Sequence, residues 1–168
     1  MAAQYKTVDG AQVGVLMGSA SDWETMSKCS ATLKKLGIAH ECNAISAHRN
    51  AERLAAYIED AEKRGVEVFI CAAGGAAHLA GVVASMTGLP VLACPMAGWS
   101  LDGLDSLLSM VQMPKGVPVA TFAIGSHGAV NAALFAAAIL GLSDDRVKAA
   151  WRDFRAKQSA AVQELPED

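Results

Sequence analysis

The sequence has few aromatic residues and no hydrophobic stretch long enough to cross a membrane. Aromatic residues make up 5% of the 168 residues, although 52% are hydrophobic and the mean hydropathy is +0.27. The excess is mostly Ala, Val, Leu and Met, and such apolar side chains suit tight helix packing and buried subunit contacts. The longest apolar stretch, residues 132–140, is too short for a membrane span, and the first ten residues lack the features of a signal peptide. We therefore expect a cytoplasmic protein with no membrane partner.

Clustered basic residues and paired cysteines are also missing. The formal net charge is -3 and no basic stripe is present, which excludes the usual electrostatic pattern of a nucleic-acid-binding protein and favours a small ligand. Cys29, Cys42, Cys71 and Cys94 are scattered without C-x-x-C spacing, so the sequence predicts neither a zinc site nor a redox pair. We expect free thiols that pack as small hydrophobic groups.

Short apolar stretches alternate with helical patterns along the chain. The predicted strands cover residues 13–18, 40–45, 67–73, 90–94 and 118–124. The predicted helices cover residues 22–36, 51–64, 77–87, 101–110 and 129–140. Strands that are apolar without alternation are typical of a parallel sheet covered on both faces. The pattern therefore predicts an α/β fold, a three-layer α/β/α sandwich with about five parallel strands.

The last part of the chain, residues 143–168, follows this complete pattern. It begins with a good helix start, and Val147, Trp151 and Phe154 recur at helical spacing. Two interpretations are open: a helix that packs on its own domain, or an arm that reaches a neighbouring subunit. We expect a single domain over residues 1–168, with a flexible N-terminus over residues 1–11 and a C-terminal helix and tail over residues 143–168.

Polar residues gather where predicted strands end, which is where ligands bind in open α/β sheets. Residues 18–22, Gly-Ser-Ala-Ser-Asp, precede a helix whose free amides suit a phosphate. Ser21 and Glu24 also fit a capping box, which needs no ligand. That box leaves Ser19 free for a ligand and Asp22 free for ribose hydroxyls.

The next two strand-end loops carry the other reactive groups. Ser46, His48 and Arg49 supply a hydroxyl, a proton carrier for neutral pH and a phosphate clamp. The loop of residues 74–78, Gly-Gly-Ala-Ala-His, lets backbone approach a flat ligand, although its glycines would also suit close helix packing. A fourth loop, residues 125–128, has a similar composition but is more typical of an exposed turn.

Four ordered motifs give a resemblance to a known family. They are Met-Gly-Ser-Ala-Ser-Asp-Trp at 17–23, Ser-Ala-His-Arg at 46–49, Ala-Gly-Gly-Ala-Ala-His-Leu at 73–79 and Leu-Asp-Ser-Leu-Leu-Ser-Met-Val-Gln-Met-Pro at 104–114. Together they resemble the N5-carboxyaminoimidazole ribonucleotide mutase family, the catalytic-subunit type of phosphoribosylaminoimidazole carboxylase. The resemblance implies a flavodoxin-like subunit in a homo-octamer, with the C-terminal helix reaching a neighbour. It also implies a carboxylate transfer in purine biosynthesis that uses no metal, ATP or biotin.

The resemblance assigns roles to individual residues. His48 would be the general acid and base of a decarboxylation and recarboxylation in which carbon dioxide stays enclosed. Ser19, Ser46 and Arg49 would hold the phosphate of the ribonucleotide, and Asp22 would hold its ribose. The remaining predicted substrate-binding residues are Ser21, Gly74, Gly75, Ala76, His78 and Leu79, and residues 107–114 would form a wall that excludes water.

The sequence departs from the family pattern in three places. Asn50-Ala51 replaces a common Thr-Pro, Ala80 replaces a Pro, and Trp99 stands in a loop where family members usually carry small or polar residues. Three alternative functions stay open: a carboxylase that uses free carbon dioxide, a paralogue that makes a pyridinium dicarboxylate cofactor, and a nucleotide-binding module without catalysis. The motif at 73–79 favours the mutase over the first, and the second carries an additional N-terminal region that this sequence does not show.

Overall fold

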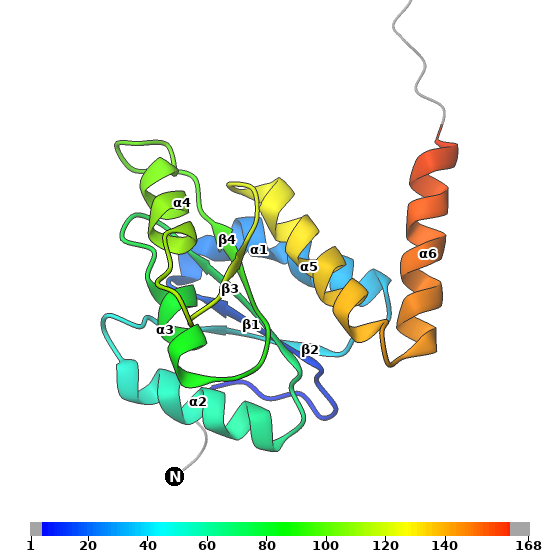
Figure 1. Ribbon diagram of the computed structural model, residues 1–168, viewed down its shortest axis with the longest axis horizontal. Helices are drawn as coiled ribbons and strands as arrows, with labels where there is room; N and C mark the ends of the chain where they lie inside the picture. The colour runs from blue at the N-terminus through cyan, green and yellow to red at the C-terminus, as the bar shows by residue number, and fades with distance from the viewer. Residues whose placement is uncertain (1–4, 162–168) are drawn as a thin grey trace, which may run out of the picture.

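A parallel sheet between two layers of helices forms the body of the molecule (Figure 1). The computed structural model describes residues 5–161, and within them the sheet has five strands in the order β2-β1-β3-β4-β5, all paired in parallel. The strands are β1 Val13–Met17, β2 His40–Ala44, β3 Val68–Ala73, β4 Val91–Pro95 and β5 Ala120–Thr121. The predicted α/β/α sandwich is confirmed.

The helices follow the strands in alternation. Within the described residues they are α1 Trp23–Lys35, α2 Ala51–Lys63, α3 Leu79–Met86, α4 Leu104–Val111, α5 Ser126–Leu140 and α6 Asp145–Ala160, with a 3-10 turn at Ala20–Asp22. Residues of α1, α5 and α6 join the apolar core on one face of the sheet, and residues of α2, α3 and α4 join the core on the other. Every residue of β1, β3 and β4 is buried, which is why their sequences are apolar without alternation.

The largest error in the predicted elements is the strand at 118–124, of which only Ala120 and Thr121 pair with β4. The chain leaves the sheet after these two residues, although the amides of Phe122 and Gly125 still donate to carbonyls of β4. The start of α4 was also placed three residues early, because Gly103 adopts a left-handed φ of 90° immediately before the helix.

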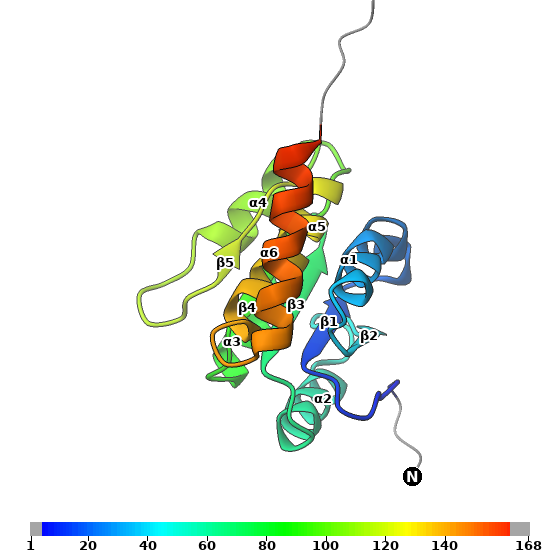
Figure 2. The ribbon, with the colours of Figure 1, turned by 90° about the vertical axis from the view of Figure 1, so that its right-hand side faces the viewer.

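The C-terminal helix α6 packs on its own chain at its first half (Figure 2). Asp144 caps it by accepting hydrogen bonds from two amides of the first turn, as the predicted helix start requires. Val147 is buried, and Trp151 and Phe154 stack with ring centroids 6.0 Å apart against the α1 and α5 side of the core. Residues 155–161 are exposed, and the predicted tail beyond them, like residues 1–4, lies outside the described part of the chain.

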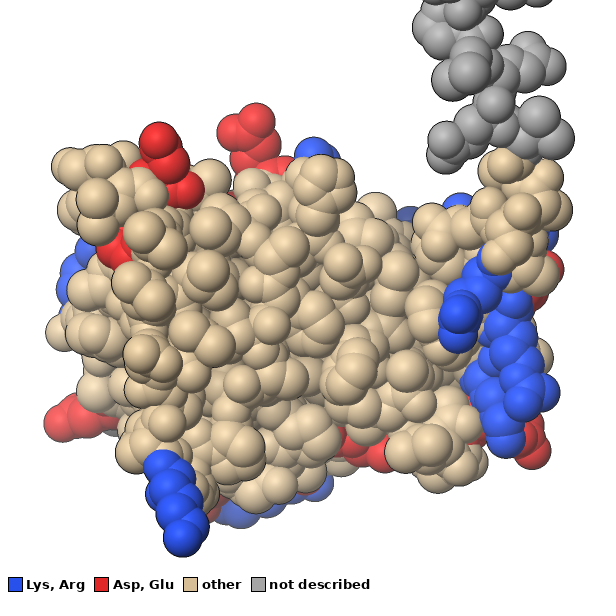
Figure 3. Space-filling model, turned by 45° about the horizontal axis from the view of Figure 1, so that its top comes forward, with Lys and Arg blue, Asp and Glu red and all other residues tan. Residues whose placement is uncertain are grey.

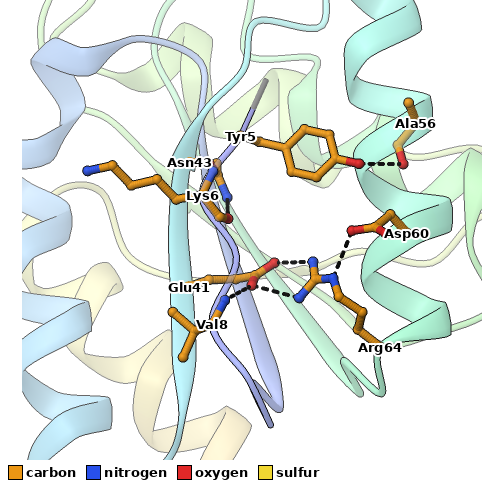
Figure 4. A network of polar contacts seen from close by, with 8 residues as sticks. All are labelled: Tyr5, Lys6, Val8, Glu41, Asn43, Ala56, Asp60 and Arg64. Carbon is orange, nitrogen blue, oxygen red and sulfur yellow. Dashed lines mark hydrogen bonds and ion pairs between the residues drawn. The ribbon is translucent and has the colours of Figure 1, made fainter. Parts of the chain in front are cut away.

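A buried ion pair ties the edge strand β2 to helix α2 (Figure 4). The Glu41 side chain has no exposed surface and accepts two hydrogen bonds from Arg64, at 2.7 and 2.9 Å, and one from the amide of Val8 at 2.8 Å. Arg64 also donates from Nε to Asp60 at 2.7 Å. Burial raises the pKa of Glu41, but the hydrogen bonds from Arg64 and Val8 outweigh it and hold that pKa below its usual value.

The same side of β2 holds the N-terminal segment in place. Asn43 exchanges two hydrogen bonds with the backbone of Lys6, at 2.8 and 2.9 Å. Tyr5 packs edge-on against Tyr57, with ring centroids 5.1 Å apart, and donates to the carbonyl of Ala56 (Figure 4). Residues 5–8 are therefore attached to both β2 and α2.

We predict that Arg64→Ala lowers the free energy of unfolding by about 3 to 5 kcal/mol, because it leaves a buried carboxylate without its partner. Urea unfolding at fixed protein concentration measures the loss. The folded-state pKa of Glu41 lies below its unfolded value of about 4.3, so the stability from the pair is complete above that pH and is lost as the pH falls through the folded pKa. Lys63→Ala, which removes an exposed pair with Glu59, should change little. A difference in the free energy of unfolding between wild type and Arg64→Ala that stays constant from pH 7 to about pH 3 would contradict this account.

Candidate active site

The loops that follow β1, β2, β3 and β4 meet at one edge of the sheet. Met17 at the end of β1 pairs with Ala44 of β2 and with Ala72 of β3, so the strand ends are level. The chain runs from β1 outward to β2 and then back across to β3, and this reversal opens a crevice between the loops after β1 and β3. A cavity of about 680 Å³ lies there, of the size of a small-molecule site.

All the predicted site residues except Gly75 line this cavity. The lining residues are Gly18, Ser19, Ser21, Asp22, Glu24, Thr25, Ser46, Ala47, His48, Arg49, Ala73, Gly74, Ala76, His78, Leu79, Met96, Ala97, Gly98 and Trp99. Residues 96–98 also line the cavity, since they follow β4 just as the predicted site residues follow the other strands. Residues 107–114 and 125–128 do not line the cavity within one chain.

The predicted capping box of Ser21 and Glu24 is wrong, because Ser19 and Asp22 form the box instead. The amide of Ser19 donates to Oδ2 of Asp22 at 3.1 Å, and the hydroxyl of Ser19 accepts from the amide of Ser21 at 3.3 Å. The 3-10 segment already begins at Ala20, so the cap falls at Ser19, two residues earlier than the pattern suggested. Burial raises the pKa of Asp22, and the Ser19 amide opposes that shift.

Arg49 and Ser46 connect the loop after β2 to the loop after β1. Arg49 donates from Nη2 to the carbonyl of Gly18 at 3.2 Å, and its amide donates to the hydroxyl of Ser46 at 3.3 Å. A second hollow of about 340 Å³ adjoins the cavity and also includes these three residues. Asn50 caps α2 through a bond from the Arg53 amide at 3.0 Å, so this departure from the family pattern keeps the helix start.

The imidazoles of His48 and His78 face each other across the cavity. Nε2 of His48 lies 2.9 Å from Nδ1 of His78, and the ring planes meet at 83°. A hydrogen bond between two imidazole nitrogens needs one donor and one acceptor, so the two facing nitrogens share a single proton. The facing nitrogens are thus partners of each other, and a ligand is left with the other ring nitrogen of each imidazole.

Gly75 lies behind the cavity wall. It is buried with a left-handed φ of 64°, and its amide donates to the buried hydroxyl of Ser106 at 3.0 Å. Its carbonyl accepts from the amide of Ala77 at 2.8 Å. Both polar groups of Gly75 are thus used within the protein, while Gly74 and Ala76 on either side face the cavity.

None of the four cysteines lines the cavity. All four cysteines are free, as predicted, and burial raises the pKa of each, that of Cys94 to about 12. Among the described residues, no three His, Cys, Asp or Glu side chains are grouped so that they could hold a metal ion. Over the same part of the chain, no helix is both long and apolar enough to cross a membrane.

Comparison with known proteins places these features in a family. Residues 12–161 match the family model described as AIR carboxylase. The chain is 54% identical over 157 residues to the N5-carboxyaminoimidazole ribonucleotide mutase of Pseudomonas aeruginosa, covering 94% of this chain and 96% of that protein. The chain belongs to the AIR carboxylase family. The predicted resemblance to this family is confirmed.

Further relatives agree with this family membership. The Brucella melitensis protein of the same name is 51% identical over 154 residues, covering 92% of this chain and 95% of that protein. The crystal structure of Treponema denticola PurE superposes with a TM-score of 0.81 at 30% identity, covering 88% of this chain and 90% of that chain. The fold of the AIR carboxylase family is therefore established here by both sequence and structure.

We predict that Gly75→Ala lowers the free energy of unfolding by about 1 to 2 kcal/mol, because an L side chain resists a left-handed backbone. Gly37→Ala is the matched control, since Gly37 has a φ of 70° and its added methyl group would meet nothing within 4 Å. At Gly75 the methyl group would lie 3.2 Å from Trp99, so only this variant should also change the tryptophan emission. An unchanged emission in Gly75→Ala would contradict the position of Trp99 against this loop.

Proposed function

We propose that the chain is an N5-carboxyaminoimidazole ribonucleotide mutase, which moves a carboxylate from the exocyclic nitrogen of the ribonucleotide to the adjacent ring carbon in purine biosynthesis. The observation that carries the proposal is the His48–His78 pair, at 2.9 Å, in a strand-end cavity. The mutase activity of relatives that are about half identical to this chain supports it.

The phosphate of the substrate fits the end of the cavity where Arg49 lies. Its guanidinium donates from Nη2 to the carbonyl of Gly18, and Ser19 and Ser46 line the same cavity. Guanidinium and hydroxyl groups are the side chains that suit phosphate oxygens. Asp22 engages Oδ2 in the capping box, which leaves Oδ1 to accept hydrogen bonds from the ribose.

The aminoimidazole ring of the bound substrate then lies toward His48 and His78. It lies between Gly74, Ala76 and Leu79. In the first step the bond between nitrogen and carboxylate carbon breaks, carbon dioxide leaves, and His48 protonates the nitrogen. In the second step the ring carbon attacks the carbon dioxide and His48 removes the proton from that carbon. One proton is delivered and one is recovered, so a single imidazole serves both steps without a net change.

The carbon dioxide must stay in the cavity between the two steps, because recapture within one site is far faster than recapture from solution. His48 and His78 are both exposed in the single chain, so the cavity needs further walls. We propose that neighbouring copies of the chain supply them in a homo-octamer, with α6 reaching across to a neighbour.

The surface of the subunit supports such an assembly. Between residues 68 and 143 the sequence has only three charged residues, Asp102, Asp105 and Lys115. Ten large hydrophobic side chains are exposed within residues 5–161, and eight of them lie in the same range, among them Leu104, Leu108 and Val111 along α4. Figure 3 shows a broad area without charged side chains and charged residues around its margin. The location we propose is the cytoplasm, where free thiols and purine precursors occur together.

We predict that His48→Asn lowers kcat by about 100-fold or more while nucleotide binding persists, because the variant loses the proton carrier. Arg49→Ala should instead weaken nucleotide binding by about 2 to 5 kcal/mol. Absorbance assays of the interconversion and titrations with 4-carboxy-5-aminoimidazole ribonucleotide measure the two effects.

Wild-type turnover in His48→Asn would overturn the role of His48, and binding without turnover in wild type would favour a non-catalytic module. Net carboxylation that requires added bicarbonate would favour the carboxylase that uses free carbon dioxide.

We predict a native mass near eight times the 17.4 kDa of the subunit in light scattering coupled to gel filtration. The double variant Leu104→Glu, Leu108→Glu should give a smaller mass, because it places charges in the apolar stripe of α4. Ala55→Glu on the exposed face of α2 is the matched control. A monomeric wild type at micromolar concentration would rule out the octamer.

A further inference from the structure

Trp99 is the most exposed aromatic side chain of the described residues, and it lies at the mouth of the cavity. Its exposed fraction is 78%, yet it lines the cavity together with Ala97 and Gly98. A single exposed apolar side chain needs no explanation by itself, so the place of this indole against the loop of residues 74 and 75 at the cavity is what counts. We propose that Trp99 is a substrate-contacting wall, whose indole covers the flat heterocycle of the bound nucleotide and retains carbon dioxide. The inference rests on the proposed mutase function.

The position of the indole carries the proposal. Methyl groups built on Gly74 and Gly75 would lie 3.5 Å from Nε1 and 3.2 Å from Cε2 of Trp99, so one part of the ring already lies over this loop. The loop is held from its other side by Ser106, which accepts from the Gly75 amide. The indole thus stands on a fixed base beside the place assigned to the imidazole of the substrate.

The backbone around Trp99 is arranged to present this side chain. Trp99 has a φ of 61° and Asp102 a φ of 48°, both in the left-handed region that bulky residues avoid. The loop is closed at its base by a hydrogen bond from the Gly103 amide to the Gly98 carbonyl at 3.1 Å. An unfavourable conformation at an exposed residue persists where the surrounding structure enforces it, which is typical of functional loops.

The first test is binding, measured without turnover in the His48→Asn background. Addition of 4-carboxy-5-aminoimidazole ribonucleotide should protect tryptophan emission from acrylamide quenching. The protection should be absent in Trp99→Phe and present in Trp23→Phe, whose replaced residue is 45% exposed but does not line this cavity. Protection that persists in Trp99→Phe would overturn the proposal.

The second test is the fate of carbon dioxide in the active enzyme. Trp99→Ala should raise KM by about 3- to 10-fold, because a stacked aromatic contact is lost. It should also raise several-fold the fraction of substrate released as aminoimidazole ribonucleotide. Trp99→Phe, which keeps an aromatic ring, should give values of both between those of Trp99→Ala and wild type. A change in native mass with unchanged KM and unchanged release would overturn the proposal and make Trp99 an assembly residue.

The two proposals fail in different ways. A wild type that binds the nucleotide but never interconverts it refutes the mutase function, whatever Trp99 does. An active wild type whose KM and release of aminoimidazole ribonucleotide are the same in Trp99→Ala refutes the role of Trp99 alone. The quenching experiment needs no folded alanine variant, so it decides the question even where Trp99→Ala is unstable.

Discussion

The level alignment of the parallel strand ends is the constraint on which the rest of the structure depends. Because β1 pairs with β2 on one side and β3 on the other in the same register, three chain segments leave the sheet at one height. Each loop is then short, and the loops after β1 and β3 start from strands in which every residue is buried. Hydrogen bonds between loops, such as that from Arg49 to Gly18, complete the arrangement at low entropic cost.

The candidate site combines rigid parts with one open side. The Gly75 backbone uses both of its polar groups within the protein, and the Ser19–Asp22 box uses Oδ2 of Asp22 to fix the loop after β1. The proposed chemistry falls to exposed side chains, above all His48 and His78. This division agrees with the general observation that reactive groups are positioned by a scaffold rather than built into it.

The sequence was sufficient to predict the layers, because strands buried on both faces leave continuous apolar stretches. It failed at β5, where only two residues pair and pairing is decided by how the chain leaves the sheet. Ser19, rather than Ser21, caps the first turn because a 3-10 turn at Ala20–Asp22 precedes α1, which a pattern of small polar residues does not encode. The motifs identified the cavity residues, but not that His48 bonds to His78, since these residues are 30 positions apart. Nor did a Gly-Gly pair reveal which glycine faces the cavity.

The buried Glu41 has a consequence for the state of the protein in a crowded cell. An edge strand is a template for pairing with strands of other chains, and an inward-pointing charge is one natural defence against this. β2 carries Glu41 and Asn43 on its inner side, both bound to partners that a strand shifted by one residue would lose. The opposite edge of the sheet, β5, has only two residues to offer. Both edges of the sheet therefore resist the strand-to-strand growth that leads to fibrils.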